Sequence, residues 1–148
     1  MPGEAERLPF FYFTAKRREE TVSDRMTIER AIKEADALCQ NKYDNESKYS
    51  WLSRLDMMVA DEIIRKSEKG KDFKFKGYGK GTPGNTELIV PEPYAEMYIH
   101  YIHSKIYLFN QDYERYNTAT AAFYSAYQDF AEYYIRENEP PRMGIKVY

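Results

Sequence analysis

Three side chains in the second half of the chain have the spacing of metal ligands. Glu96, His100 and His103 stand at i, i+4 and i+7, which places them on one side of a helix. Histidine and carboxylate ligands at such spacing can hold zinc. The HExxH order is missing, the chain has only 2 histidines, and a fourth ligand would have to be another carboxylate or Cys39. We therefore expect packing or partner contacts at these residues, with no metal and no cofactor.

Residues 79–82 (Gly-Lys-Gly-Thr) have the composition of a phosphate-binding loop. Such a loop needs a glycine five residues before the Gly-Lys pair and Ser or Thr directly after the lysine. Lys74 and Gly81 occupy those two positions, so the pattern fails. Ser, His and carboxylate residues occur elsewhere without a motif that joins a nucleophile to a base. The sequence therefore predicts no enzyme.

Lysines surround this glycine-rich segment. Phe73, Phe75 and Tyr78 interleave with them, a combination of charge and stacking that nucleic-acid surfaces use. Phe73 and Phe75 would equally suit core contacts from one strand face. Contact with double-stranded DNA here would be electrostatic and independent of base sequence. The sequence leaves open whether DNA or a neighbouring protein faces these lysines, which are Lys69, Lys71, Lys74, Lys76 and Lys80.

Helical periodicity covers most of the chain. The spacing of apolar residues predicts helices near residues 27–40, 47–68, 93–109 and 112–138. The fourth helix has a seam of mostly Tyr and Phe from Tyr113 to Tyr134, in alternating steps of three and four residues. The expected core contains Ile32, Leu38, Trp51, Leu55, Val59, Ile102, Ile106, Phe123, Tyr127 and Phe130.

Two short segments between the second and third helices have strand character. Residues 72–76 alternate polar and aromatic side chains, and residues 87–90 form a second short apolar run. They could pair as a hairpin, or each could add to a strand of another subunit. The predicted fold class is mainly α: a four-helix bundle-like subunit with a short β-hairpin or strand insertion and extended N- and C-terminal arms.

Length and composition indicate one domain. The 148 residues suffice for a single core, with an N-terminal arm at 1–25, a helical domain at 26–139 containing a glycine/lysine-rich loop at 69–90, and a C-terminal tail at 140–148. The net charge of -2 gives no argument for nucleic-acid or membrane binding. Cys39 is the only cysteine, so no disulfide forms within the chain. No apolar run reaches membrane-spanning length, and we expect no membrane partner.

Apolar residues at both ends of the chain are the candidates for partner binding. Four adjacent aromatic residues in the N-terminal arm need a surface to lie on, either that of their own domain or that of a partner. Apolar residues alternate in the C-terminal tail, which suits an added β-strand. The residues concerned are Phe10, Phe11, Tyr12 and Phe13 in the arm, and Arg142, Met143, Ile145, Val147 and Tyr148 in the tail.

Several stretches come in a recognisable order. They are residues 27–28 (Thr-Ile), 51–56 (Trp-Leu-Ser-Arg-Leu-Asp), 88–94 (Leu-Ile-Val-Pro-Glu-Pro-Tyr) and 110–117 (Asn-Gln-Asp-Tyr-Glu-Arg-Tyr-Asn), followed by Phe123, Tyr127, Phe130, Tyr133 and Tyr134. Over residues 26–138 this order resembles the small head–tail connector proteins of long-tailed bacteriophages, also called adaptor or head-completion proteins.

The resemblance implies a structural virion protein. Its subunits would form an oligomeric ring of about twelve copies beneath the portal protein, extend the DNA channel and offer a docking surface to the next tail-side connector or stopper protein. Such a protein assembles in the host cytoplasm during head completion and resides in the neck of the virion. The lysines would then face either the DNA in the lumen or a neighbouring protein.

Two rival interpretations remain at this stage. One is a small cytoplasmic helical dimer that acts as a regulatory, toxin-neutralising or interaction protein. The other is a metal-dependent enzyme that uses Glu96, His100 and His103. Size in solution distinguishes a ring from a dimer, and metal analysis tests the enzyme.

Overall fold

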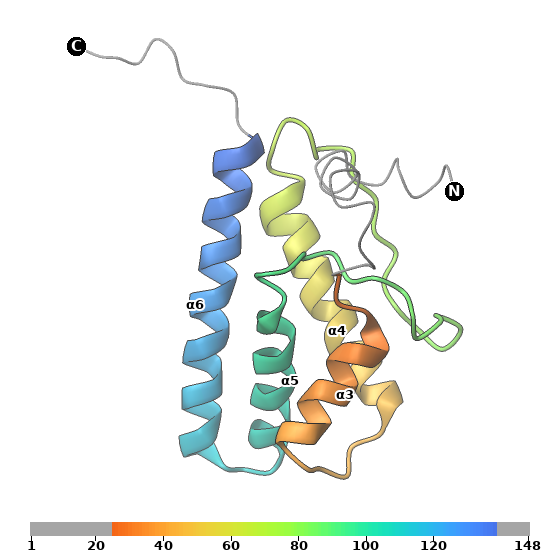
Figure 1. Ribbon diagram of the computed structural model, residues 1–148, viewed down its shortest axis with the longest axis vertical. Helices are drawn as coiled ribbons and strands as arrows, with labels where there is room; N and C mark the ends of the chain where they lie inside the picture. Colours follow the sequence, from red (N-terminus) through yellow and green to blue (C-terminus); the bar gives the residue numbers. More distant parts are fainter. Residues whose placement is uncertain (1–24, 139–148) are drawn as a thin grey trace, which may run out of the picture.

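The computed structural model describes residues 25–138 (Figure 1). The predicted C-terminal tail and all but the last residue of the predicted N-terminal arm lie outside the described residues. The described helices are α3 (Ile28–Leu38), α4 (Asn45–Val59), the π-helical turn η1 (Ala60–Ile64) that continues α4, α5 (Glu96–Phe109) and α6 (Tyr113–Asn138). The predicted mainly helical class is therefore confirmed for this part of the chain.

Side-chain caps explain where the helices begin. The hydroxyl of Thr27 accepts a hydrogen bond from the backbone N–H of Arg30 (3.2 Å) at the start of α3. The carboxylate of Asp44 accepts one from Ser47 (2.9 Å) at the start of α4. These caps satisfy N–H groups that have no partner within the helix. α5 begins later than predicted because residues 91–95 form turns before it.

α4 ends earlier than the predicted range of 47–68. The chain passes through η1, and the hydroxyl of Ser67 then donates to the carbonyl oxygen of Ile64 (2.8 Å) and accepts from the N–H of Gly70 (3.0 Å). A Cβ atom on Gly70 would lie 2.3 Å from the Ile64 carbonyl oxygen. A turn built around Ser67 therefore stops the helix, and it requires glycine at position 70.

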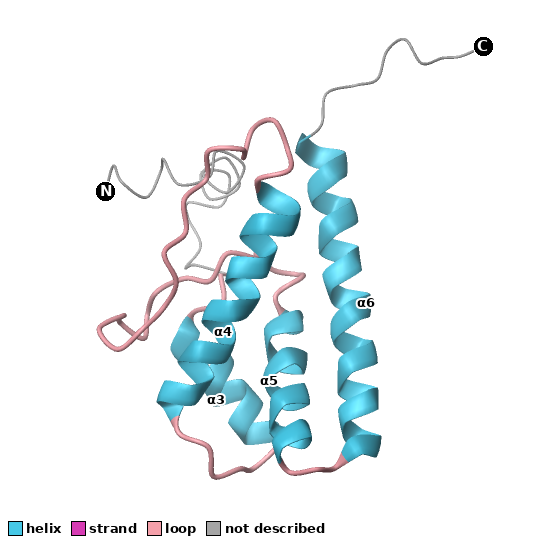
Figure 2. Ribbon diagram, turned by 180° about the vertical axis from the view of Figure 1, so that it is seen from behind, coloured by secondary structure: helices cyan, strands magenta, loops and turns pink. Residues whose placement is uncertain are grey.

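The predicted β-hairpin does not form among the described residues (Figure 2). The segment around Glu87 makes an isolated antiparallel bridge with Thr27 instead. Its hydrogen bonds run from Ile28 N to Thr86 O (3.0 Å) and from Leu88 N to Met26 O (2.9 Å). The chain that precedes α3 therefore takes the edge of residues 86–88, and residues 72–76 do not pair with it.

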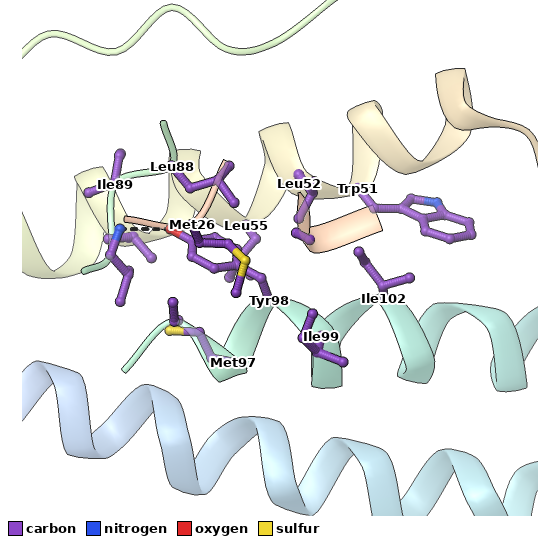
Figure 3. Packing of buried hydrophobic residues seen from close by; sticks show 14 of the residues in the cluster. Met26, Trp51, Leu52, Leu55, Leu88, Ile89, Met97, Tyr98, Ile99 and Ile102 are labelled. Atoms are coloured by element: carbon purple, nitrogen blue, oxygen red, sulfur yellow. Dashed lines mark hydrogen bonds between the residues drawn. The ribbon is translucent and has the colours of Figure 1, made fainter. Parts of the chain in front are cut away.

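α5 lies in the middle of the bundle, with α6 on one side and α3 and α4 on the other (Figures 1 and 2). Figure 3 shows the core around α5, where side chains from α4, α5 and residues 88–89 meet. Eight of the ten predicted core residues are buried: Ile32, Trp51, Leu55, Val59, Ile102, Ile106, Phe123 and Phe130. Tyr127 is half-buried, with its hydroxyl donating to Glu62 (2.6 Å).

Leu38 was wrongly predicted to be in the core, since its side chain is 74% exposed. The buried stripe of α3 consists of Ile28, Ala31, Ile32 and Ala35. With 3.6 residues per turn, Leu38 lies roughly 70° from the centre of that stripe. The helix also ends there, because the backbone of Cys39 is extended. The following residue, Cys39, packs against the core instead.

These positions predict opposite outcomes for two similar substitutions. Leu55→Ala should lower the free energy of unfolding by about 2–5 kcal/mol, because Leu55 is fully buried and its loss leaves a cavity. Leu38→Ala should change it by less than about 0.5 kcal/mol. Urea unfolding of both variants measures the difference, and equal losses would contradict the placement of Leu38.

Candidate functional site: the lysine loop and its anchor

The carboxylate of Asp56 anchors the long connection between α4 and α5. Its side chain is fully buried. One carboxylate oxygen accepts from the hydroxyl of Tyr98 (2.6 Å). The other accepts from the hydroxyl of Tyr78 (2.5 Å) and from the backbone N–H of Ile89 (3.1 Å). One residue of α4 therefore fixes two parts of the connection and the first turn of α5.

Further hydrogen bonds complete this network. The hydroxyl of Tyr98 also accepts from the backbone N–H of Val90 (2.8 Å). The guanidinium of Arg25 donates to the carbonyl oxygens of Leu88 (2.9 Å) and Ile89 (3.0 Å). Apart from the backbone bond between Leu88 and Met26, residues 88–90 thus make their polar contacts with side chains and none with the backbone of residues 72–76.

Burial raises the pKa of Asp56 from 3.8 to about 6. The three hydrogen bonds lower the pKa, and the nearby charge of Arg25 lowers it further. Loss of hydration in the core outweighs them because the charged form is the one that needs water. Burial also raises the pKa of Tyr98, and the Asp56 charge adds to that effect, so Tyr98 keeps the proton that it donates.

The lysine loop (residues 69–82) is tied to the domain at both ends. Near its start, the carbonyl oxygen of Phe73 accepts from Arg65 Nε (2.8 Å). Near its tip, the backbone N–H of Tyr78 donates to Ser53 Oγ (3.0 Å). Gly77 has a φ of 96°, which side chains with a Cβ rarely adopt. This turn at Gly77 brings Tyr78 to Ser53 and Asp56.

The structure separates the aromatic and basic residues of the loop. Phe73, Phe75 and Tyr78 are half-buried and pack against the core. The rings of Phe75 and Tyr78 meet edge to face, with centroids 5.0 Å apart. The core interpretation of the two phenylalanines is therefore confirmed. The five predicted lysines are all exposed: Lys69, Lys71, Lys74, Lys76 and Lys80.

Two of these lysines have acidic neighbours. Lys71 lies 4.0 Å from Glu68, and Lys80 lies 3.9 Å from Glu46. Exposed pairs at such distances contribute little to stability. Lys80 also lines an open groove of about 640 Å³ between the loop tip and the first turns of α4. The groove mixes hydroxyl, aromatic and charged side chains: Asn45, Glu46, Tyr49, Ser50, Ser53, Arg54, Tyr78, Gly79 and Lys80.

The histidine pair of α5 makes contacts within the fold. His103 Nε2 lies 3.0 Å from the carbonyl oxygen of Ala35, which joins α5 to α3. Burial lowers the pKa of His100. Within residues 25–138, no three His, Cys, Asp or Glu side chains are grouped so as to hold a metal ion. Glu96, His100 and His103 therefore form no such group.

The terminal candidates lie outside the described residues. They are Phe10, Phe11, Tyr12 and Phe13 in the arm, and Arg142, Met143, Ile145, Val147 and Tyr148 in the tail.

Sequence reasoning missed Asp56 as the anchor of the loop. The available signal was a carboxylate within the apolar stripe of α4, next to Leu55 and between Leu52 and Val59.

Comparison with protein families, curated proteins and solved structures finds no significant match to this chain. Among the described helices, none combines the length and apolarity needed to cross a membrane.

The raised pKa of Asp56 predicts that stability falls as the pH rises. Between the pKa of 3.8 in the unfolded chain and about 6 in the folded chain, the folded state binds more protons than the unfolded state. The contribution of Asp56 is therefore fully present below the lower value and is lost as pH rises through the higher one. Two pKa units correspond to about 3 kcal/mol.

The variant Asp56→Asn isolates this contribution, because asparagine does not titrate and keeps one acceptor oxygen. Urea unfolding gives the free energies of unfolding of the native chain and the variant. Their difference, native minus variant, should fall by about 3 kcal/mol between about pH 4 and pH 7. A difference that is constant or rises over this range would show that Asp56 has an ordinary or lowered pKa.

Proposed function

We propose that this chain is a structural subunit of a bacteriophage head–tail connector. Copies of it would form a ring of about twelve subunits beneath the portal protein and extend the DNA channel. The ring would offer its far side to the next connector or stopper protein of the tail. The subunit would assemble in the host cytoplasm and remain in the neck of the virion, with a structural and no catalytic role.

The observation that carries this proposal is an uncharged, exposed face on α6. Tyr113, Tyr124 and Ile135 are 58%, 59% and 51% exposed. They are spaced eleven residues apart, close to three helical turns, and so share one face. Only uncharged residues lie between them on that face: Asn117, Thr120, Gln128 and Ala131. Such a surface suits contact with another protein better than contact with water.

The position of α6 supports contact with a neighbouring copy. Among the described helices, α6 packs mainly on α5 and, more weakly, on η1. It is the edge helix of the bundle (Figure 1), so its outer side is open to a second subunit. In a ring, this face would meet a different surface of the next copy, which is the head-to-tail arrangement that cyclic assemblies use.

A charge placed in the centre of this face tests the proposal. Tyr124→Lys should prevent ring formation on purified portal, because assembly would bury the added ammonium group without a partner. Thr118→Lys adds the same charge at an exposed position on another side of α6 and should assemble normally. Analytical ultracentrifugation and electron microscopy of the portal complexes measure the outcome, and normal rings with Tyr124→Lys would exclude this interface.

The C-terminal tail is proposed to bind the portal rather than the subunit's own bundle. Deletion of residues 141–148 should change the melting temperature by less than about 2 °C. The same deletion should abolish binding to portal particles in a pull-down. A large drop in melting temperature would instead place the tail on its own domain.

The lysine loop is proposed to face either DNA in the lumen or a neighbouring protein, and contact with DNA is the alternative tested first. Its contacts would be few, weak and sensitive to salt, since lysines alone bind phosphates and read no bases. Replacing Lys69, Lys71, Lys74, Lys76 and Lys80 together with Gln should reduce genome retention in filled heads. Full heads that fail to join tails would assign the loop to a protein interface, and normal infectivity would remove both roles.

A second candidate function is a helical dimer that acts as a regulatory or interaction protein. It is favoured by the symmetry of the α6 face, in which Tyr113 and Ile135 are equally distant from Tyr124. Two antiparallel copies of α6 could pair about a two-fold axis at Tyr124, with Glu114 of one copy near Arg136 of the other. The mass of the purified chain at increasing concentration distinguishes a closed dimer from a subunit that assembles on a portal.

A further inference from the structure

The lysine loop contains an extended segment with an open backbone edge. Residues 73–76 alternate half-buried phenylalanine and exposed lysine side chains, as the residues of a β-strand do. Within the described part of the chain, the backbone N–H and C=O groups of Lys74, Phe75 and Lys76 form no hydrogen bond. A row of such groups is a template for pairing with another extended segment.

A cavity lies beside this edge. Its volume is about 310 Å³, and its walls come from the loop and from the segment that precedes α5. Arg25, the first described residue, also lines it. The wall residues are Arg25, Phe73, Lys74, Phe75, Lys76, Gly77, Tyr78, Thr82, Thr86, Glu87, Leu88 and Ile89. Across the cavity, the segment around Glu87 pairs with the chain before α3 and makes no backbone hydrogen bond to Lys74, Phe75 or Lys76.

We propose that the aromatic patch of the chain's own N-terminal arm, residues 10–13 (Phe-Phe-Tyr-Phe), adds to the edge of residues 74–76 as a β-strand. Because the N–H and C=O groups of successive residues in a strand point to opposite edges, the backbone of the patch bonds alternate residues, either Phe75 or both Lys74 and Lys76. Its inward aromatic side chains fill the cavity beside Phe73 and Phe75. This proposal concerns a single subunit and is independent of whether subunits form rings.

The chemistry of both faces selects this occupant. In a strand, Phe10 and Tyr12 point to one face, and Phe11 and Phe13 point to the other. Aromatic residues on the inner face would make cross-strand pairs with the loop phenylalanines. Aromatic residues on the outer face would lie next to the ammonium groups of the loop lysines, which are attracted to ring faces.

The C-terminal tail fits this edge less well. Met143, Ile145 and Val147 alternate with Gly144 and Lys146. If its apolar residues faced the cavity, Lys146 would lie on the outer face beside the loop lysines. Like charges directly opposite each other on neighbouring strands are destabilising. The arm carries no charge within residues 10–13 and avoids this repulsion.

The covalent connection favours the arm over a foreign peptide. Residues 14–24 join the patch to Arg25, which lines the cavity. Eleven residues of extended chain reach about 36 Å, whereas the three-residue edge is about 10 Å long. The linker therefore allows the arm to turn back onto the loop. A tethered segment competes at an effective concentration in the millimolar range.

Hydrogen exchange of the full-length chain, followed by NMR, tests the proposal. The amides that bond the patch, either that of Phe75 or those of both Lys74 and Lys76, should exchange about 10–100 times more slowly than unprotected amides. Replacing Phe10, Phe11, Tyr12 and Phe13 together with Ser should remove that protection. The amide of Ile102 in α5 should stay protected in both proteins, which shows that the bundle remains folded.

A matched variant of the other terminus serves as the control. Replacing Met143, Ile145 and Val147 with Ser should leave the loop amides protected. Protection lost in this variant, or kept in the arm variant, would overturn the proposal. Unprotected amides in the native chain would overturn it too. The edge would then be unpaired, and the charged lysines would keep other strands from adding to it. Protection that rises with protein concentration would assign the edge to the arm of a second copy and overturn docking within one chain.

Discussion

The buried carboxylate of Asp56 receives hydrogen bonds from three residues that lie 22, 33 and 42 positions further along the chain. Tyr78 belongs to the lysine loop, Ile89 to the segment before α5, and Tyr98 to α5 itself. No regular secondary structure joins these parts. Their shared acceptor on α4 therefore defines where the loop tip lies and where α5 begins. Together with the bonds from Arg65 to Phe73 and from Tyr78 to Ser53, this network positions the exposed lysines and the open edge of residues 74–76.

Burying this group costs free energy, and the raised pKa of Asp56 shows that its hydrogen bonds offset only part of the cost. The Asp56 carboxylate also satisfies the hydroxyl of Tyr98. Tyr98 is fully buried, and a buried tyrosine hydroxyl needs a partner. Asp56 provides that partner, and the same hydroxyl accepts from Val90. Removing Asp56 or Tyr98 would leave a buried polar group unsatisfied, so the network favours a single arrangement of the connection.

This fold leaves two surfaces exposed for contact with other groups, one on the lysine loop and one on α6. Side chains hold residues 88–90, so the extended part of the lysine loop keeps its backbone edge and presents its lysines to water. At the edge of the bundle, α6 buries Phe123 and Phe130 against α5, while Tyr124 stays on the outer side. An assembling subunit needs one surface for its own kind and others for its neighbours. These two surfaces are the ones that the proposals use.

The sequence by itself determined the four helices and most of the core. Apolar spacing and capping are local properties, set by residues within one or two turns of each other, so they can be read along the chain. The lysines were also evident as a run, and the phenylalanines between them followed strand alternation. Only the tertiary structure decided that no hairpin forms and that Asp56 anchors the loop. Each of these outcomes depends on which distant residue makes the hydrogen bond at a given backbone edge or side chain in the folded structure. The periodicity of one segment cannot predict these contacts. They join residues 30 to 60 positions apart, as from Asp56 to Ile89 and from Thr27 to Glu87.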